Sequence, residues 1–129
     1  MAQYLTVDDI CRINEAEVGP NLLADFGLVE SAVLRPQSTI GGQDAYPDIH
    51  RKAAALFHSL VSNHAFLDGN KRTAVLAVIA FFNLNGWSLR ADQGDLVNFA
   101  VWVAELHPSV EGIAEWLAER TAPLDLPQE

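Results

Sequence analysis

The sequence contains very little cysteine and few basic side chains. Cys11 is the only cysteine in 129 residues, which excludes an intrachain disulfide and a zinc site built from several thiolates. Eight Lys and Arg residues stand against 17 Asp and Glu, and the formal net charge is -9. A chain of this charge lacks the broad basic surface that binds nucleic acid. Any anion must therefore be bound by a local basic cluster, and Lys71-Arg72 is one.

A long hydrophobic run is also missing. The longest one, from Ala74 to Phe82, is far shorter than the roughly 20 residues that a membrane-spanning helix needs. The chain does not open with a basic segment followed by an apolar one, as a signal peptide does. We therefore expect no contact with a membrane and a cytoplasmic location, which suits a single reduced cysteine.

Helix signals run along most of the chain. Half of the residues are hydrophobic, which is enough for one sizeable core. We predict a single all-α domain over residues 1–129, a compact helical bundle around a buried central helix. That central helix is expected to be the fourth, because it is apolar on nearly all sides. Capping residues, helical spacing of apolar residues and Gly or Pro stops place six helices at about residues 7–18, 28–35, 47–63, 70–84, 93–106 and 110–120.

Three segments fall outside the helical pattern. Residues 37–46 lack helical periodicity and contain Gly41-Gly42, so we expect an exposed loop or a small hairpin there. Residues 87–89 are expected to be extended. About residues 122–129 are expected to form a flexible tail.

Titratable and cationic residues are concentrated around a glycine at residues 64–73, between two apolar helical segments. Gly69 permits a tight turn and a close approach of a ligand to the backbone. The N–H groups of Asn70, Lys71 and Arg72 open the next helix, where they lack partners and where the helix dipole favours an anion. The side chains of Lys71 and Arg72 add full positive charge. This segment therefore predicts an anion-binding site.

Two further residues of the segment suggest chemistry on that anion. Asp68 would repel phosphates unless a divalent cation bridged them, and Mg²⁺ commonly uses one or two carboxylates plus substrate phosphates. His64, at the end of the preceding helix, can take a proton from a hydroxyl group near neutral pH. A base, a metal carboxylate and an anion site together predict phosphoryl or nucleotidyl transfer to an alcohol.

Each of these residues taken singly also has a purely structural interpretation. His64 could be a helix-end histidine bonded to the backbone, and Asp68 could be a simple helix cap. Lys71 and Arg72 could be a solvated first turn. Phe66 is expected to anchor the segment on the core under either interpretation.

The segment is long enough to resemble a known signature. His-x-Phe-x-Asp-Gly-Asn-Lys-Arg at residues 64–72 is similar to the signature of the Fic/Doc family, and specifically of its Doc (death-on-curing) branch. The resemblance covers roughly residues 3–120 and implies an all-helical fold that uses ATP to modify a protein hydroxyl group. Other stretches that resemble Doc-type chains are Tyr4-Leu5-Thr6, Leu28-Val29-Glu30-Ser31-Ala32, Arg35-Pro36-Gln37, Tyr46-Pro47, Lys52-Ala53-Ala54-Ala55 and Asn85-Gly86.

The resemblance also implies a role for each matching position. It makes His64 the catalytic base and Asp68 the Mg²⁺ ligand. Residues 37–46 would be a flap over the substrate cleft. The phosphate-binding turn would consist of Gly69, Asn70, Lys71 and Arg72.

Two positions depart from the wider Fic pattern. Fic AMP-transferases have Gly where this chain has Lys71, and a second Arg where it has Val75. Doc-type chains with Asn-Lys-Arg are similar here, and they act as kinases on an elongation factor of the EF-Tu type, which blocks translation. The resemblance therefore implies a toxin that transfers the ATP γ-phosphate to a Ser or Thr of a translation factor. The alternatives are an AMP-transferase that acts on a protein hydroxyl, and a catalytically inactive protein that only binds a partner.

The sequence lacks the internal inhibitor that some Fic proteins carry. That inhibitor is a helix with the pattern Ser/Thr-x-x-x-Glu-Gly/Asn. The only Glu-Gly here is Glu111-Gly112, and His107 lies four residues before Glu111. We therefore expect inhibition by a separate partner, a Phd-like antitoxin whose flexible tail folds into a helix in a groove near Lys71-Arg72 and the flap.

Overall fold

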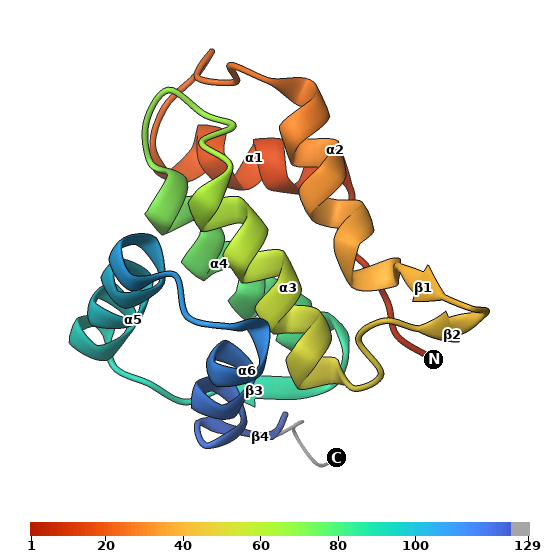
Figure 1. The fold of residues 1–129 in the computed structure, drawn as a ribbon. Helices are drawn as coiled ribbons and strands as arrows, with labels where there is room; N and C mark the ends of the chain where they lie inside the picture. The colour runs from red at the N-terminus through yellow and green to blue at the C-terminus, as the bar shows by residue number, and fades with distance from the viewer. Residues whose placement is uncertain (125–129) are drawn as a thin grey trace, which may run out of the picture.

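The fold is built around two long antiparallel helices joined by the short loop that carries the predicted site (Figure 1). The computed structural model describes residues 1–124, and the part of the predicted tail at 125–129 lies outside the described residues. The helices are α1 (Val7–Glu17), α2 (Phe26–Leu34), the 3-10 turn η1 (Arg35–Gln37), α3 (Ile49–Ser62), α4 (Asn70–Leu84), α5 (Gln93–Leu106) and α6 (Val110–Ala118). The strands are β1 (Thr39–Ile40), β2 (Gln43–Asp44), β3 (Trp87–Leu89) and β4 (Thr121–Pro123).

Helix α3, rather than α4, is the most buried element. Nine of its 14 residues are buried, against six of the 15 in α4. The run Ala53-Ala54-Ala55 has no exposed surface, and such small side chains let neighbouring helices approach α3 from several sides. Val75 and Leu76 of α4 remain partly exposed. The prediction of α4 as the central buried helix is therefore only partly right, because one apolar side of α4 faces outward.

Aromatic side chains fill the space between α3, α5 and α6. The rings of Phe57 and Phe99 stack with centroids 4.5 Å apart, and Phe99 stacks on Trp116 at 3.9 Å. Contacts between stacked aromatic rings add to the free energy gained by burial of the rings. This three-ring stack holds α5 and α6 against α3.

Local caps determine where most of the helices begin. Thr6 forms a capping box with Asp9, and the side chains of Asp25, Asp92 and Ser109 each accept a backbone N–H from the first turn that follows. Helix α3 begins at Ile49, two residues later than predicted, because Asp48 caps it by accepting the Arg51 N–H.

Two small antiparallel ribbons accompany the helices, so the expectation of an all-α fold holds for most of the chain only. In the first ribbon, Thr39 pairs with Asp44, and Gly41-Gly42 supply the two positive φ angles of the turn. The predicted hairpin at residues 37–46 is thus confirmed. In the second ribbon, Leu89 pairs with Thr121, which confirms the extended segment at 87–89. Residues 122 and 123 belong to this ribbon, so the prediction of a tail beginning at 122 is wrong.

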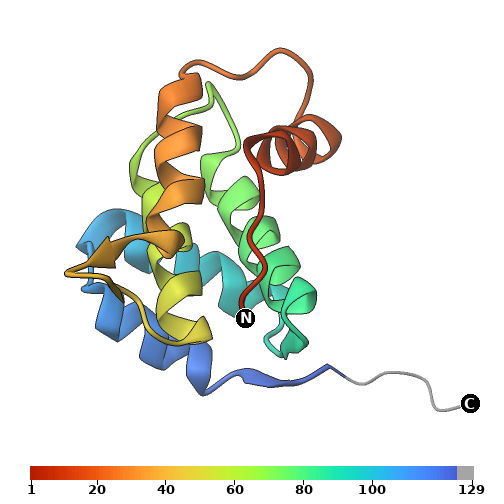
Figure 2. The same cartoon turned by 90° about the vertical axis from the view of Figure 1, so that its right-hand side faces the viewer.

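The hairpin does not lie over the predicted site. Asp44 of β2 forms an ion pair at 3.3 Å with Lys52, which lies in the first turn of α3. The loop between α3 and α4 follows the other end of α3, and a helix of 14 residues is about 21 Å long. Figures 1 and 2 show the hairpin and this loop at opposite ends of the helix. The expectation of a flap over the site is therefore wrong for this hairpin.

No helix within residues 1–124 is both long and apolar enough to cross a bilayer.

A half-buried arginine joins α2 to α3 and to the segment after the hairpin. Arg35 donates from Nη1 to His58 Nδ1 at 2.8 Å and to Ser59 Oγ at 3.0 Å, and from Nε to the Tyr46 hydroxyl at 3.0 Å. Burial lowers the pKa of His58 from its ordinary value of 6.5, and the nearby charges of Arg35 and His107 lower it further. Neutral His58 accepts this bond, whereas its protonated form would lose it.

The lowered pKa of His58 makes the stability of the protein pH-dependent in a defined window. Above pH 6.5 His58 is neutral in both the folded and the unfolded chain. As the pH falls from 6.5 toward the lowered pKa, the unfolded chain takes up the proton first, so the free energy of unfolding decreases. We expect His58→Gln, which keeps an acceptor for Arg35, to remove this part of the decrease. Urea unfolding of the wild-type protein and of His58→Gln at several pH values measures the decrease. An equal decrease in both proteins would refute the assignment of this pH dependence to His58.

Candidate active site

The residues from His64 to Arg72 lie in one loop and the helix start that follows it. We call residues 63–69 the α3–α4 loop. His64 is exposed, and its φ of +51° places it in the left-handed region. Such a conformation is uncommon for a residue other than glycine and occurs often at functional sites. His64 is thus held on the surface and is not packed as a structural histidine in the core.

A second chain segment holds the α3–α4 loop in place. Residues 22–25 run beside the loop, with Leu67 donating to the Leu22 carbonyl at 2.8 Å and Ala24 donating to the Ala65 carbonyl at 2.9 Å. Phe66 is only 4% exposed, which confirms its predicted role as the anchor of the loop. The backbone around His64 is therefore fixed from two sides.

Asn70 braces the loop with its side chain. Its Oδ1 accepts the Phe66 N–H at 3.1 Å, and its Nδ2 donates to the Phe66 carbonyl at 2.8 Å. The oxygen and one N–H of the amide are thereby used inside the protein. The backbone N–H of Asn70 stays open to an anion at the start of α4.

The buried Asn14 of α1 is a site residue that sequence reasoning missed. It is 2% exposed, and its Nδ2 donates to the Asp68 carbonyl at 3.1 Å and to Thr73 Oγ1 at 3.0 Å. It lies one helical turn after Ile10, on the buried face of α1. The one signal in the sequence was a polar residue on an otherwise apolar helix face. The sequence could not identify its partners, because they are more than 50 residues away.

Gly69 is required at its position for two independent reasons. Its φ of +77° is left-handed, and a Cβ added there would overlap the side chain of Val18. Gly69 also occupies the capping position of α4 and offers no side chain to the amides that follow. The first backbone bond of the helix runs from the Thr73 N–H to the Gly69 carbonyl, at 2.8 Å. The N–H groups of residues 70–72 therefore remain open to an outside acceptor.

Charged side chains of both signs surround this helix start. The exposed Asp68 accepts the Gly69 N–H at 2.8 Å through Oδ1, while its other oxygen has no partner within residues 1–124. Arg72 donates to the Glu17 carbonyl at 3.1 Å, at the end of α1, and keeps further N–H groups for a ligand. Lys71 is exposed beside it. The arrangement can bind an anion and place a divalent cation next to it.

The donor set fits Mg²⁺ only in the presence of a phosphate ligand. Asp68 is the one carboxylate of the α3–α4 loop, and residues 1–124 contain no group of three or more His, Cys, Asp or Glu side chains that could hold a metal ion. Mg²⁺ commonly combines a single protein carboxylate with substrate phosphates and water. Asp68 beside an anion-binding helix start matches that mode.

An apolar groove opens next to Lys71 and Arg72. It has a volume of about 680 Å³ and runs between α4 and α5. Val75 of α4 lies in its wall, and Val97 of α5 is 55% exposed there. Glu17 of α1 also lines the groove, which thus combines charged groups that include two cations with apolar sides.

Comparison with known proteins identifies the class to which this arrangement belongs. A model of the Fic/DOC family matches residues 4–82, which include the whole of the α3–α4 loop and nearly all of α4. The chain belongs to the Fic/Doc family. It is also 47% identical over 93 residues to Toxin Doc of Mycolicibacterium smegmatis, a match that covers 71% of this chain and 72% of that protein. The resemblance to the Doc branch is thereby confirmed.

Substitution of Gly69 tests how tightly α1 packs on the site. We expect Gly69→Ala to lower the free energy of unfolding by about 1–3 kcal/mol through backbone strain. Overlap with Val18 is expected to lower it by roughly 1–3 kcal/mol more. Gly86→Ala is the matched control, because Gly86 also has a positive φ but nothing lies within 4 Å of an added Cβ. Denaturant unfolding measures the free energy of unfolding of both variants. Equal losses would show that the Val18 side chain moves aside without a cost in stability.

Proposed function

We propose that this protein is the toxin of a toxin–antitoxin pair and transfers the ATP γ-phosphate to a Ser or Thr hydroxyl of a translation factor of the EF-Tu type. The similarity to Toxin Doc supports the first part. Fic/Doc proteins are typically transferases that act on protein hydroxyl groups. The observation that carries the proposal is the exposed, left-handed His64 beside a helix start whose amides are open.

Each side chain of the site has a role in this reaction. The N–H groups of residues 70–72, with Lys71 and Arg72, hold the phosphates of ATP. The target oxygen forms a bond to the γ-phosphorus, the bond to the β–γ bridging oxygen breaks, and ADP leaves. His64 accepts the hydroxyl proton. Asp68 would hold Mg²⁺, which neutralises phosphate charge when bound.

Two residues favour phosphate transfer over AMP transfer. Lys71 occupies the position at which Fic AMP-transferases have Gly, and its side chain adds charge and volume to the anion site. Val75, in place of a second Arg, is part of the apolar wall of the groove and cannot hold phosphate. AMP transfer is the second candidate, supported by membership of the family. An inactive partner-binding protein is the third, and the complete set of His64, Asp68 and open amides speaks against it.

Replacement of His64 separates its chemical role from its backbone role. We expect His64→Asn to reduce transfer by about 10²- to 10⁴-fold, because the general base is lost. Asn tolerates the left-handed conformation, so the melting temperature is expected to change little. The assay uses ATP labelled at either the α- or the γ-phosphate with a bacterial lysate. Label from the γ-position on a protein supports a kinase, and label from the α-position supports AMP transfer. Full activity of the variant would rule out His64 as the base.

We also propose that the antitoxin binds in the groove between α4 and α5. Its apolar walls suit one face of an amphipathic helix, and Lys71 and Arg72 at its end suit an acidic side chain on that helix. A helix placed there would lie beside the open amides of residues 70–72. This position lies next to Lys71-Arg72, as expected from the sequence. It is remote from the hairpin, which was the other expected neighbour of the antitoxin.

A charge placed in the groove tests this position. We expect Val97→Glu to weaken antitoxin binding, because it buries a carboxylate against apolar side chains. Leu106→Glu is the control, since Leu106 is exposed on the same helix but does not line the groove. Growth is measured in bacteria that express each toxin variant with and without the expected antitoxin. We take the antitoxin to be encoded by a small open reading frame next to the toxin gene. Rescue of Leu106→Glu but not of Val97→Glu supports the groove, and equal rescue of both would refute it.

A further inference from the structure

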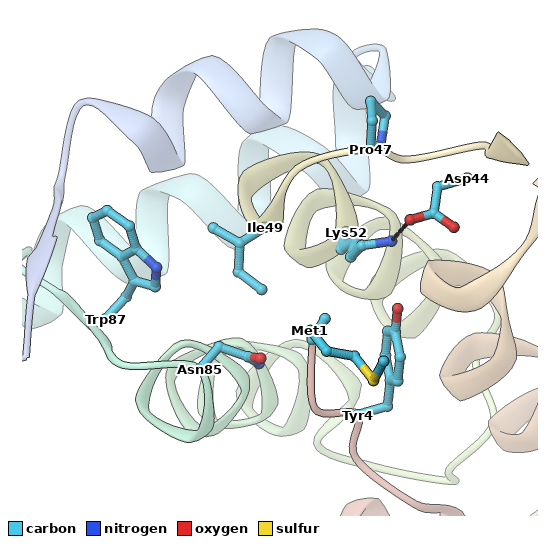
Figure 3. A pocket seen from close by; sticks show the side chains of 9 residues that line it. Met1, Tyr4, Asp44, Pro47, Ile49, Lys52, Asn85 and Trp87 are labelled. Atoms are coloured by element: carbon cyan, nitrogen blue, oxygen red, sulfur yellow. Dashed lines mark hydrogen bonds and ion pairs between the residues drawn. The ribbon is translucent and has the colours of Figure 1, made fainter.

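A second cavity lies at the end of α3 and α4 that is remote from the α3–α4 loop (Figure 3). Its volume is about 590 Å³, within the range of small-molecule sites. The N-terminal segment, the first turn of α3 and the segment after α4 all contribute to its lining. None of the residues proposed for catalysis lines it.

The cavity contains a buried ammonium group. Lys52 is 4% exposed, and its Nζ donates to the Pro36 carbonyl and to Asp44 Oδ2, both at 3.3 Å. The face of the Tyr4 ring lies 5.8 Å away. Both hydrogen bonds are long, and the carboxylate partner is itself half exposed on the hairpin. The third N–H of the Lys52 ammonium has no acceptor within residues 1–124.

Two further donors of the cavity have no partner within residues 1–124. The Tyr4 ring packs near Phe81, but no hydrogen bond involves its hydroxyl group. Trp87 packs edge-on against His50, and its indole nitrogen faces the open cavity in Figure 3. Both side chains are half-buried, and neither donor atom is sealed inside the protein, so both are open to solvent or to a ligand.

The surplus of donors determines the chemistry of a ligand. Trp87 Nε1–H can only donate, the Lys52 ammonium can only donate, and Tyr4 can donate through its hydroxyl. Ile49 and Pro47 add apolar surface to the same cavity. We propose that the cavity binds a small organic anion, a carboxylate or a phosphate ester on a compact apolar body, with Lys52 as its charge partner.

Binding of such an anion would replace the carboxylate that now occupies Lys52. Asp44 lies in β2, so a ligand on Lys52 Nζ releases the one ion pair that ties β2 to α3 within the described residues. Occupancy of the cavity is thus linked to this contact between the hairpin and α3.

The test uses the full chain and ¹⁵N-labelled tryptophan. Benzoate and phenyl phosphate are titrated separately, with benzamide as the neutral counterpart, while the three indole N–H signals are recorded by NMR. We expect the Trp87 signal to shift with saturation for at least one anion, while Trp102 and Trp116 stay unchanged. The anion that binds more tightly identifies the head group. A shift of equal affinity with benzamide, or no saturable shift with either anion, would overturn the proposal.

Variants of the cavity give a second, independent readout. Tyr4→Phe keeps the ring on Phe81 and is expected to weaken binding about 3- to 10-fold, and Lys52→Met about 10- to 100-fold. Asp44→Asn removes the competing carboxylate, so we expect binding about 2- to 5-fold tighter. If Lys52→Met does not fold, Tyr4→Phe and Asp44→Asn still decide. Unchanged affinity in both would overturn the assignment of these groups. Phosphate transfer is not needed for this experiment, so it stands apart from the proposed reaction.

Discussion

The buried side chain of Asn14 holds the α3–α4 loop against α1, and the geometry of the site depends on it. It satisfies the Asp68 carbonyl and the Thr73 hydroxyl, and an unsatisfied buried group of this kind costs about 1–3 kcal/mol. The same helix places Val18 against Gly69 and offers the Glu17 carbonyl to Arg72. Helix α1 contributes no proposed catalytic group. It nevertheless contacts both sides of the helix start at which an anion would bind.

The two ends of the α3–α4 pair are chemically distinct. One end carries His64, open amides and exposed cations, whereas the other carries the buried Lys52 and the hairpin. The alanine run of α3 lies between them, with no exposed surface. A close-packed interior of this kind has low compressibility and transmits strain. A displacement of α3 at one end would therefore be passed toward the other end.

The sequence predicted those features that depend on neighbouring residues. Caps such as Thr6 and Asp25 act on amides three residues away, and the site from His64 to Arg72 is one continuous segment, so both could be inferred from local spacing. Features that depend on distant partners were missed. Asn14 and Asp68 are 54 residues apart, β4 exists only because β3 pairs with it, and the place of the hairpin is fixed by Lys52. Periodicity also overstated the burial of α4, because it cannot tell a core face from a groove.

The two walls of the groove between α4 and α5 would contribute unequally to the proposed recognition and to the proposed chemistry. The α4 wall begins with Lys71 and Arg72, so substitutions there would also disturb the anion site. The α5 wall, with Val97, lies beyond the segment that defines the family and carries no residue of the α3–α4 loop. Duplicated copies of such a gene could therefore diverge in α5 alone. With the antitoxin docked as proposed, each copy would come to recognise its own inhibitor while the reaction stays the same, and co-resident pairs would be insulated from one another.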